Sequence, residues 1–146
     1  MNLLGVLEIS ASALTAERQR AEVLASNLAN AQTTQTAQGG PYQRQLVIFG
    51  TRRAVTSTFA RVFAGFSERY AQGVEIKRVV PDPTPPVQRF EPAHPDADSQ
   101  GYVAYPAINP IEEMVNLMGA ARSYGVNVAA VQATKNMISQ SLQILS

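Results

Sequence analysis

The 146-residue chain has a balanced charge and contains no cysteine. Its 12 basic and 11 acidic residues give a formal net charge of +1 and are dispersed, so no basic surface for nucleic acid or an anionic membrane is expected. An apolar fraction of 45% excludes wholesale disorder, and the lack of cysteine excludes disulfides and thiolate metal sites without fixing the compartment. The length fits one ordinary domain with terminal helices.

The N-terminal residues predict one long helix, from about Asn2, a candidate N-cap, to about Asn30. Along it, residues recur at alternating steps of three and four, the spacing of a coiled-coil seam. We call this row the N-terminal seam: Leu4, Leu7, Ala11, Leu14, Arg18, Ala21, Ala25 and Leu28. A row this narrow suits a partner helix better than a broad globular core.

No membrane-directed segment is expected. No run approaches the roughly 18 apolar residues of a spanning helix. The sequence from Leu3 to Ala13 imitates a secretory signal, but Glu8 interrupts its apolar stretch and no basic residue precedes it. The N-terminus is therefore interpreted as a mature helix.

Residues 32–107 predict a linker and a small β-rich insert. A polar run at 32–36 ends the first helix, and Gly39, Gly40 and Pro41 break the chain. Alternation predicts strands at 42–49 and 74–80, with shorter extended segments at 87–90 and 101–106 around a polar loop. The prolines at 81–86 lack amide donors and exclude a central strand or a helix. Residues 51–70 fit a helix or an extended segment, and their conformation is left open.

A second long helix is predicted from Asn109, as N-cap, and Pro110 to the C-terminus. Glu112 and Glu113 fall in its first turn, where they complement the helix dipole; adjacent residues diverge by about 100° and are not expected to share a site. We call its heptad-spaced row the C-terminal seam: Met114, Leu117, Ala121, Tyr124, Val128, Val131, Lys135, Ile138, Leu142 and Leu145.

These elements predict a mainly α fold with a small β-rich insert. The long helices at residues 1–31 and 108–146 are expected to pair as a coiled coil through the two seams, with a β-hairpin and proline-rich insert at 32–107. Arg18 and Lys135 interrupt the seams; they either set register or partner choice, or pack their stems while their charges reach water.

Apolar residues outside the seams stay uncovered when two helices pair along one row, and neighbouring subunits are their natural cover. This set comprises Val6, Ile9, Val23, Leu24, Ile111, Val115, Met118 and Val126. Small residues on the same helices allow close approach of further helices: Ala11, Ala25, Ala121, Gly125 and Ala129.

No catalytic, cofactor or metal site is predicted. The single histidine, His94, stands in a proline-rich loop beside Asp96 and Asp98; a divalent-ion site is conceivable there, but solvated turn residues are the better interpretation. No nucleophile has a credible partner, and Gly39–Gly40 follows no strand as a phosphate-binding loop would.

Several sequence blocks resemble bacterial flagellar proteins. Residues 9–18 followed by 26–30 are similar to the N-terminal signature of flagellar rod and hook proteins. Residues 41–45, 94–98, 101–106 and 109–115 resemble the proximal rod protein C family, as do 121–124 and 133–138. Residue 32, and the segment at 51–70, depart from that pattern.

The resemblance implies a structural subunit of the proximal rod of the flagellar basal body. Its terminal helices would assemble into a helical drive shaft that transmits torque from the motor to the hook. It further implies export through the flagellar type III apparatus without a cleaved signal, and partners among copies of itself, other rod proteins, and adaptors of the membrane ring and export gate. A small helical export chaperone or adaptor is the alternative.

Overall fold

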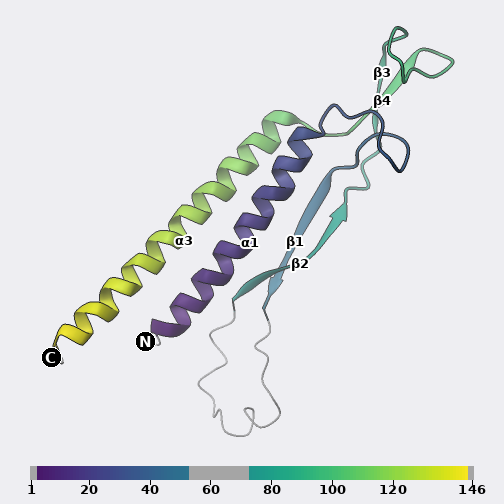
Figure 1. Cartoon of the computed structure of the whole chain (residues 1–146). Helices are drawn as coiled ribbons and strands as arrows, with labels where there is room; N and C mark the ends of the chain where they lie inside the picture. The colour runs from purple at the N-terminus through teal and green to yellow at the C-terminus, as the bar shows by residue number, and fades with distance from the viewer. Residues whose placement is uncertain (1–2, 53–72, 145–146) are drawn as a thin grey trace, which may run out of the picture. The chain divides into compact units, whose positions relative to one another are not determined.

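The computed structural model describes residues 3–52 and 73–144. Over these residues, two long helices, α1 (Leu3–Ala29) and α3 (Pro110–Ile144), flank four strands in the chain. The strands are β1 (Gln45–Thr51), β2 (Val74–Pro81), β3 (Val87–Phe90) and β4 (Tyr102–Tyr105) (Figure 1). The mainly helical fold with a small β insert is confirmed, while the expectations for Asn2, Leu145 and residues 53–70 lie outside the described residues.

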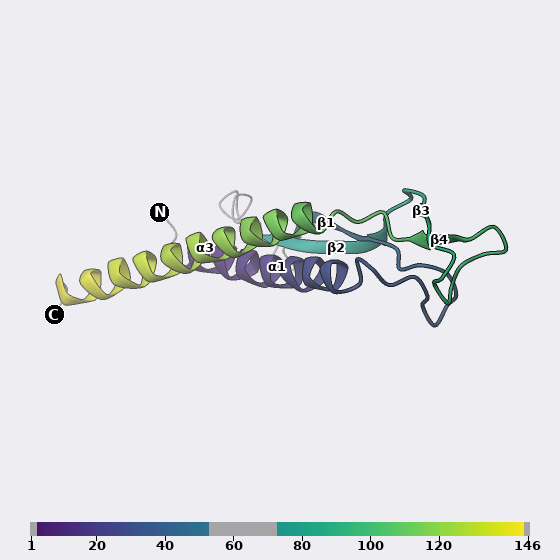
Figure 2. The same cartoon turned by 90° about the horizontal axis from the view of Figure 1, so that it is seen from above.

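The chain divides into two compact units, each containing parts of both helices. The first unit comprises residues 1–19, 49–77 and 120–146, and the second comprises 20–48 and 78–119. The start of α1 thus accompanies the end of α3 in the first unit, and the end of α1 accompanies the start of α3 in the second. Within each unit the two helices run antiparallel as neighbours (Figure 2).

The start of α3 follows the sequence prediction. Asn109 Oδ1 accepts a hydrogen bond from the Ile111 amide at 3.1 Å, and the Asn109 carbonyl accepts one from the Glu113 amide at 3.1 Å. Pro110, at the first helical position, has no amide to satisfy and its fixed φ suits the helix. The N-cap is therefore confirmed.

No described helix has the combined length and apolarity that crossing a membrane requires.

Small and polar side chains form the most buried face of the helices. On α3, Glu113, Ala120 and Thr134 are at most 2% exposed and lie on a seven-residue repeat, which places them on one face. This row precedes the C-terminal seam by one residue at each repeat. On α1, Ala16 and Leu24 are buried. The burial of Leu24 corrects the expectation that neighbouring subunits cover it.

Strands β1 and β2 pair as a two-stranded sheet. In the first unit the Arg52 amide donates to the Gly73 carbonyl at 2.8 Å, and in the second the Asp82 amide donates to the Arg44 carbonyl at 2.7 Å, which is an antiparallel pattern. The strand expected at 42–49 begins three residues later, since the Tyr42 amide donates to Thr33 in the preceding loop. The strand expected at 74–80 is confirmed.

Strands β3 and β4 form a separate antiparallel pair in the second unit, with Phe90 opposite Tyr102. The connecting loop turns at Gly101, whose φ of 84° suits glycine and whose added Cβ would lie 2.9 Å from the Phe90 ring. Asp98 Oδ1 accepts hydrogen bonds from the amides of Gln100 and Tyr102, both at 2.8 Å. The extended segments expected at 87–90 and 101–106 and the polar loop between them are confirmed.

Candidate assembly interface

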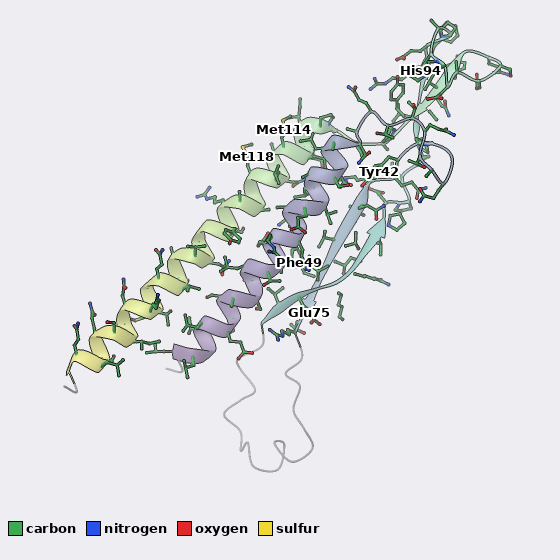
Figure 3. The ribbon with its side chains drawn as sticks, in the orientation of Figure 1. Tyr42, Phe49, Glu75, His94, Met114 and Met118 are labelled. Carbon is green, nitrogen blue, oxygen red and sulfur yellow. The ribbon has the colours of Figure 1, made fainter. Side chains whose placement is uncertain are left out.

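An exposed apolar stripe runs along the start of α3. We call it the α3 stripe, and it consists of Ile111, Met114, Val115 and Met118, which are 50–73% exposed. Their spacing places all four side chains on one side of the helix. Figure 3 shows Met114 and Met118 on the side of α3 that faces away from α1 in this unit. All four are exposed in the single chain, as the sequence predicted for Ile111, Val115 and Met118.

The seam residues divide into exposed and half-buried members. The exposed ones are Leu4, Ala11, Arg18, Ala25, Met114, Ala121, Tyr124, Lys135 and Leu142. The half-buried ones are Leu7, Leu14, Ala21, Leu28, Leu117, Val128, Val131 and Ile138. In the N-terminal seam the two kinds alternate strictly, so this row follows the edge of the buried face and offers every second side chain to solvent.

Small residues that were expected to admit further helices are also on the outside. Ala11, Ala25, Ala121, Gly125 and Ala129 are all exposed, and a Cβ added at Gly125 would meet no atom within 4 Å. The small residues that the single chain buries are others, such as Ala16 and Ala120. The exposed set leaves room for close approach by a neighbouring subunit.

In the first unit, Ser12 joins α1 to the start of β2. Its hydroxyl donates to the Ile9 carbonyl at 2.7 Å and accepts a hydrogen bond from the Val74 amide at 3.0 Å. Beside this contact lies a hollow of about 420 Å³. Its lining includes Glu8, Thr15, Gln19, Arg52 and Glu75. A mixed polar lining of this kind suits a surface contact better than an apolar ligand.

A buried polar cluster connects three segments of the second unit. The side chain of Asn27, 1% exposed near the end of α1, donates to the Gln45 carbonyl at 2.9 Å and to Glu113 Oε2 at 3.2 Å. Its Oδ1 accepts hydrogen bonds from the Gln45 amide at 2.8 Å and the Tyr42 hydroxyl at 3.0 Å. We call Asn27, Tyr42, Arg44, Gln45 and Glu113 the Asn27 cluster.

Arg44 supplies the positive charge of the cluster. Its Nε donates to Glu113 Oε1 at 2.8 Å, and its terminal nitrogens lie 3.5 Å from Asp82 and 3.7 Å from Glu112. Partial burial lowers the pKa of Arg44, but the hydrogen bond and charge of Glu113, with Glu112 and Asp82, raise it overall. The guanidinium thus remains charged and compensates the carboxylate of Glu113, which is 1% exposed.

The interpretation of Glu112 and Glu113 needs correction. Both were expected to serve the helix dipole without sharing a site, yet both carboxylates contact Arg44. The guanidinium is broad enough to meet two side chains that diverge around the helix. Sequence reasoning missed the cluster because 86 positions separate Asn27 from Glu113. The sequence signal that could have indicated the cluster was the position of Asn27 and Glu113, each directly before an apolar seam residue.

Polar atoms of the histidine loop form hydrogen bonds within the loop and with Thr34 of the linker. His94 Nδ1 accepts a hydrogen bond from the Asp96 amide at 3.1 Å, and Asp96 Oδ2 accepts one from the Thr34 hydroxyl at 2.7 Å. Across residues 3–52 and 73–144, no group of three or more His, Asp or Glu residues is arranged to hold a metal ion. These contacts fit the turn interpretation of the loop.

Comparison with known proteins finds relatives over nearly the whole length of the chain. Residues 7–35 match the family model of the flagella basal body rod protein, and 99–144 match that of the flagellar basal body rod FlgEFG protein C-terminal region. The chain is 35% identical to the flagellar basal-body rod protein FlgC of Borreliella burgdorferi, covering 99% of each chain. It is 37% identical to FlgC of Bacillus subtilis, covering 94% of this chain and 95% of the relative.

The chain belongs to the FlgC family of flagellar basal-body rod proteins. FlgC of Escherichia coli O6:H1 is likewise similar, at 36% identity over 99% of this chain and 98% of that one. The resemblance to the proximal rod protein C family is confirmed, and so is the function of a structural subunit of the basal-body rod. All three relatives are named as flagellar basal-body rod proteins.

Proposed function

We propose that the chain enters the rod through the outward faces of α1 and α3, and that its seams pair with helices as a coiled coil within the assembled shaft. The α3 stripe is the observation that carries this proposal, because four large apolar side chains stand exposed on one helix face. Apolar surface gains about 25 cal/mol per Å² when it is removed from water, so a neighbouring subunit would cover it favourably.

The contact is proposed to be heterologous, meaning that the α3 stripe meets a different surface on the next subunit. When the rotation from one subunit to the next does not close a ring, repeated contacts of this kind generate a helical filament. Exposed small residues of the same helices, such as Ala121 and Gly125, would let the neighbour's helix approach closely. A dense helical layer of this kind would transmit torque.

The proposed partners are copies of this chain, other rod proteins, and adaptors of the membrane ring and export gate at the rod base. Nucleic acid and direct membrane insertion are not part of the proposal. The periplasmic location and type III export without a cleaved signal are proposed from the similarity to flagellar basal-body rod proteins. An export chaperone is the alternative, and cell fractionation separates the two: a rod subunit is recovered in purified basal bodies, and a chaperone stays in the cytosol.

Substitutions at Met118 test the α3 stripe. Met118→Asp places a charge on the proposed contact, so we expect loss of rods and of swimming, whereas Met118→Leu keeps an apolar side chain of similar volume and should leave both intact. Rods are counted in basal bodies purified from cells that carry each variant as their sole copy. Because Met118 is 63% exposed, the change should not unfold the chain itself.

Two half-buried seam residues extend the test. Leu117→Asp and Val131→Asp are expected to abolish rod assembly and motility, because each replaces an apolar seam side chain by a charge. Normal motility in cells carrying Met118→Asp would remove the α3 stripe from the interface. Normal motility with both seam variants would refute coiled-coil pairing through the seams.

A further inference from the structure

Buried polar side chains on the helices bond in two different ways. The Thr134 hydroxyl donates to the Ala130 carbonyl at 2.9 Å, which satisfies it within its own helix. Such a bond survives any sliding of one helix along another. Asn27 and Glu113 instead bond from one helix to the other, across 86 positions of sequence. Their hydrogen bonds therefore depend on the relative position of α1 and α3 in the second unit.

The Asn27 carboxamide is matched to its surroundings at every polar atom. It donates to and accepts from the backbone of Gln45, as a neighbouring strand residue would, and so completes the first position of β1. Its remaining donor reaches Glu113, while Oδ1 also accepts from Tyr42. Aspartate has no donors and glutamine is one methylene longer, so neither reproduces this set of bonds.

We propose that the Asn27 cluster is a register latch, which fixes α1 against α3 and allows β1 to begin only when the helices are correctly aligned. Helix faces lined by small and apolar residues pack almost equally well when one helix slides by a heptad, whereas buried polar groups are satisfied in one register alone. A one-heptad slide would bring Ala120 to the place of Glu113. The Glu113 carboxylate would then be separated from Asn27 and Arg44, which strongly disfavours that register.

The latch would also set the position of the α3 stripe, since Glu113 lies between Ile111 and Met114 in the sequence. In this respect the inference rests on the proposed function, because the stripe is useful to a neighbouring subunit only when α3 is held in one place. Asn27 is accordingly a positioning residue, which acts through Glu113 and the start of β1 without itself lying on the surface.

An exchange of amide and carboxylate tests the latch. Asn27→Asp places a second carboxylate where the Asn27 amide now lies 3.2 Å from Glu113 Oε2. The two like charges should lower the yield of rods in purified basal bodies about tenfold or more. Combining it with Glu113→Gln restores a donor and an acceptor at the 27–113 contact and returns the cluster to its original net charge. The double variant should recover most of the yield, falling short because the Gln45 carbonyl still lacks its side-chain donor.

Asn30→Asp is the matched control. It is the same change three residues along the helix end, where the Asn30 side chain donates to the Ser26 carbonyl at 2.9 Å in its own segment. Addition of Glu113→Gln should give no recovery of any defect that Asn30→Asp causes. Recovery specific to position 27 is the result that a purely local role of Asn27 at the start of β1 would not produce.

The outcomes separate the latch from the proposed function. If Asn27→Asp assembles normally, or if Glu113→Gln fails to improve it, the latch is overturned while the rod function stands. If the unmodified chain is missing from purified basal bodies, the proposed function itself fails. Recovery in the Asn27→Asp, Glu113→Gln double variant, with no recovery when Glu113→Gln is added to Asn30→Asp, supports the latch.

Discussion

Individual residues of this chain show how a buried charge is made tolerable. Glu113 is 1% exposed, a position where an unpaired carboxylate would be strongly disfavoured. Arg44 donates to Glu113 Oε1 and Asn27 donates to Oε2, so each carboxylate oxygen accepts a hydrogen bond. Thr84 hydrogen bonds and then the charge of Arg44 lower the pKa of Asp82, which keeps a second carboxylate ionised beside the guanidinium.

Removal of Arg44 should therefore cost much more than removal of one of its exposed partners. Arg44→Met leaves Glu113 buried without a compensating charge, and we expect the free energy of unfolding to fall by about 3 kcal/mol. Glu112→Gln is the control: this side chain is 61% exposed and 3.7 Å from the guanidinium, so a loss below about 1 kcal/mol is expected. Urea unfolding of the purified variants at neutral pH measures both, and equal losses would contradict the prediction.

At the scale of elements, local rules predicted where helices and strands lie. Asn109 and Pro110 predicted the start of α3, and the alternation of side chains predicted β2. Both predictions were possible because caps and period-two patterns are local properties of the sequence. The start of β1 was predicted three residues too early, because the Tyr42 amide bonds to Thr33 in the preceding loop and the Gln45 amide bonds to Asn27, 18 positions earlier. Hydrogen bonds between remote segments leave no periodic signal.

The buried face of the helices was harder to predict. The heptad pattern indicated contact along Met114 and Ala121, yet the deeply buried residues are Glu113 and Ala120, one position earlier. A sequence pattern records which residues avoid water in the working protein, without saying which partner covers them. Part of the apolar row is exposed in the single chain, and the small and polar row beside it is buried, with Glu113 bonded to Asn27 of α1.

The N-cap of α3 gives a prediction at this scale. Asn109→Ala removes the acceptor of the Ile111 amide and should lower the free energy of unfolding by about 1 kcal/mol. Asn109→Asp keeps the acceptor at the positive end of the helix dipole and should stay within a few tenths of a kcal/mol of the original chain. Thermal unfolding followed by far-ultraviolet circular dichroism compares them. If alanine and aspartate destabilise equally, the cap contributes nothing.

Over residues 3–52 and 73–144, the molecule buries little apolar side-chain volume. Among the described residues, the largest fully buried side chains are Glu113, Val103, Asn27 and Thr134, of which only Val103 is apolar. Large apolar side chains such as Met118, Val126 and Leu142 are each 63% exposed. Because hydrophobic burial is the dominant favourable term in folding, the isolated chain should be weakly stable and the assembled one much more so.

Hydrogen exchange tests this difference between the isolated and the assembled chain. In the purified full-length protein, we expect the amides of α1 and of α3 beyond Ala120 to exchange with low protection, because local opening costs little where few apolar contacts are broken. In purified basal bodies the same amides should exchange at least about a hundredfold more slowly, since neighbours bind only the folded helices. The β3–β4 pair around buried Val103 serves as an internal reference, because its contacts lie within its own unit. Equal protection of the helices in both states would mean that the chain stabilises them alone, and the exposed apolar faces would then need another explanation.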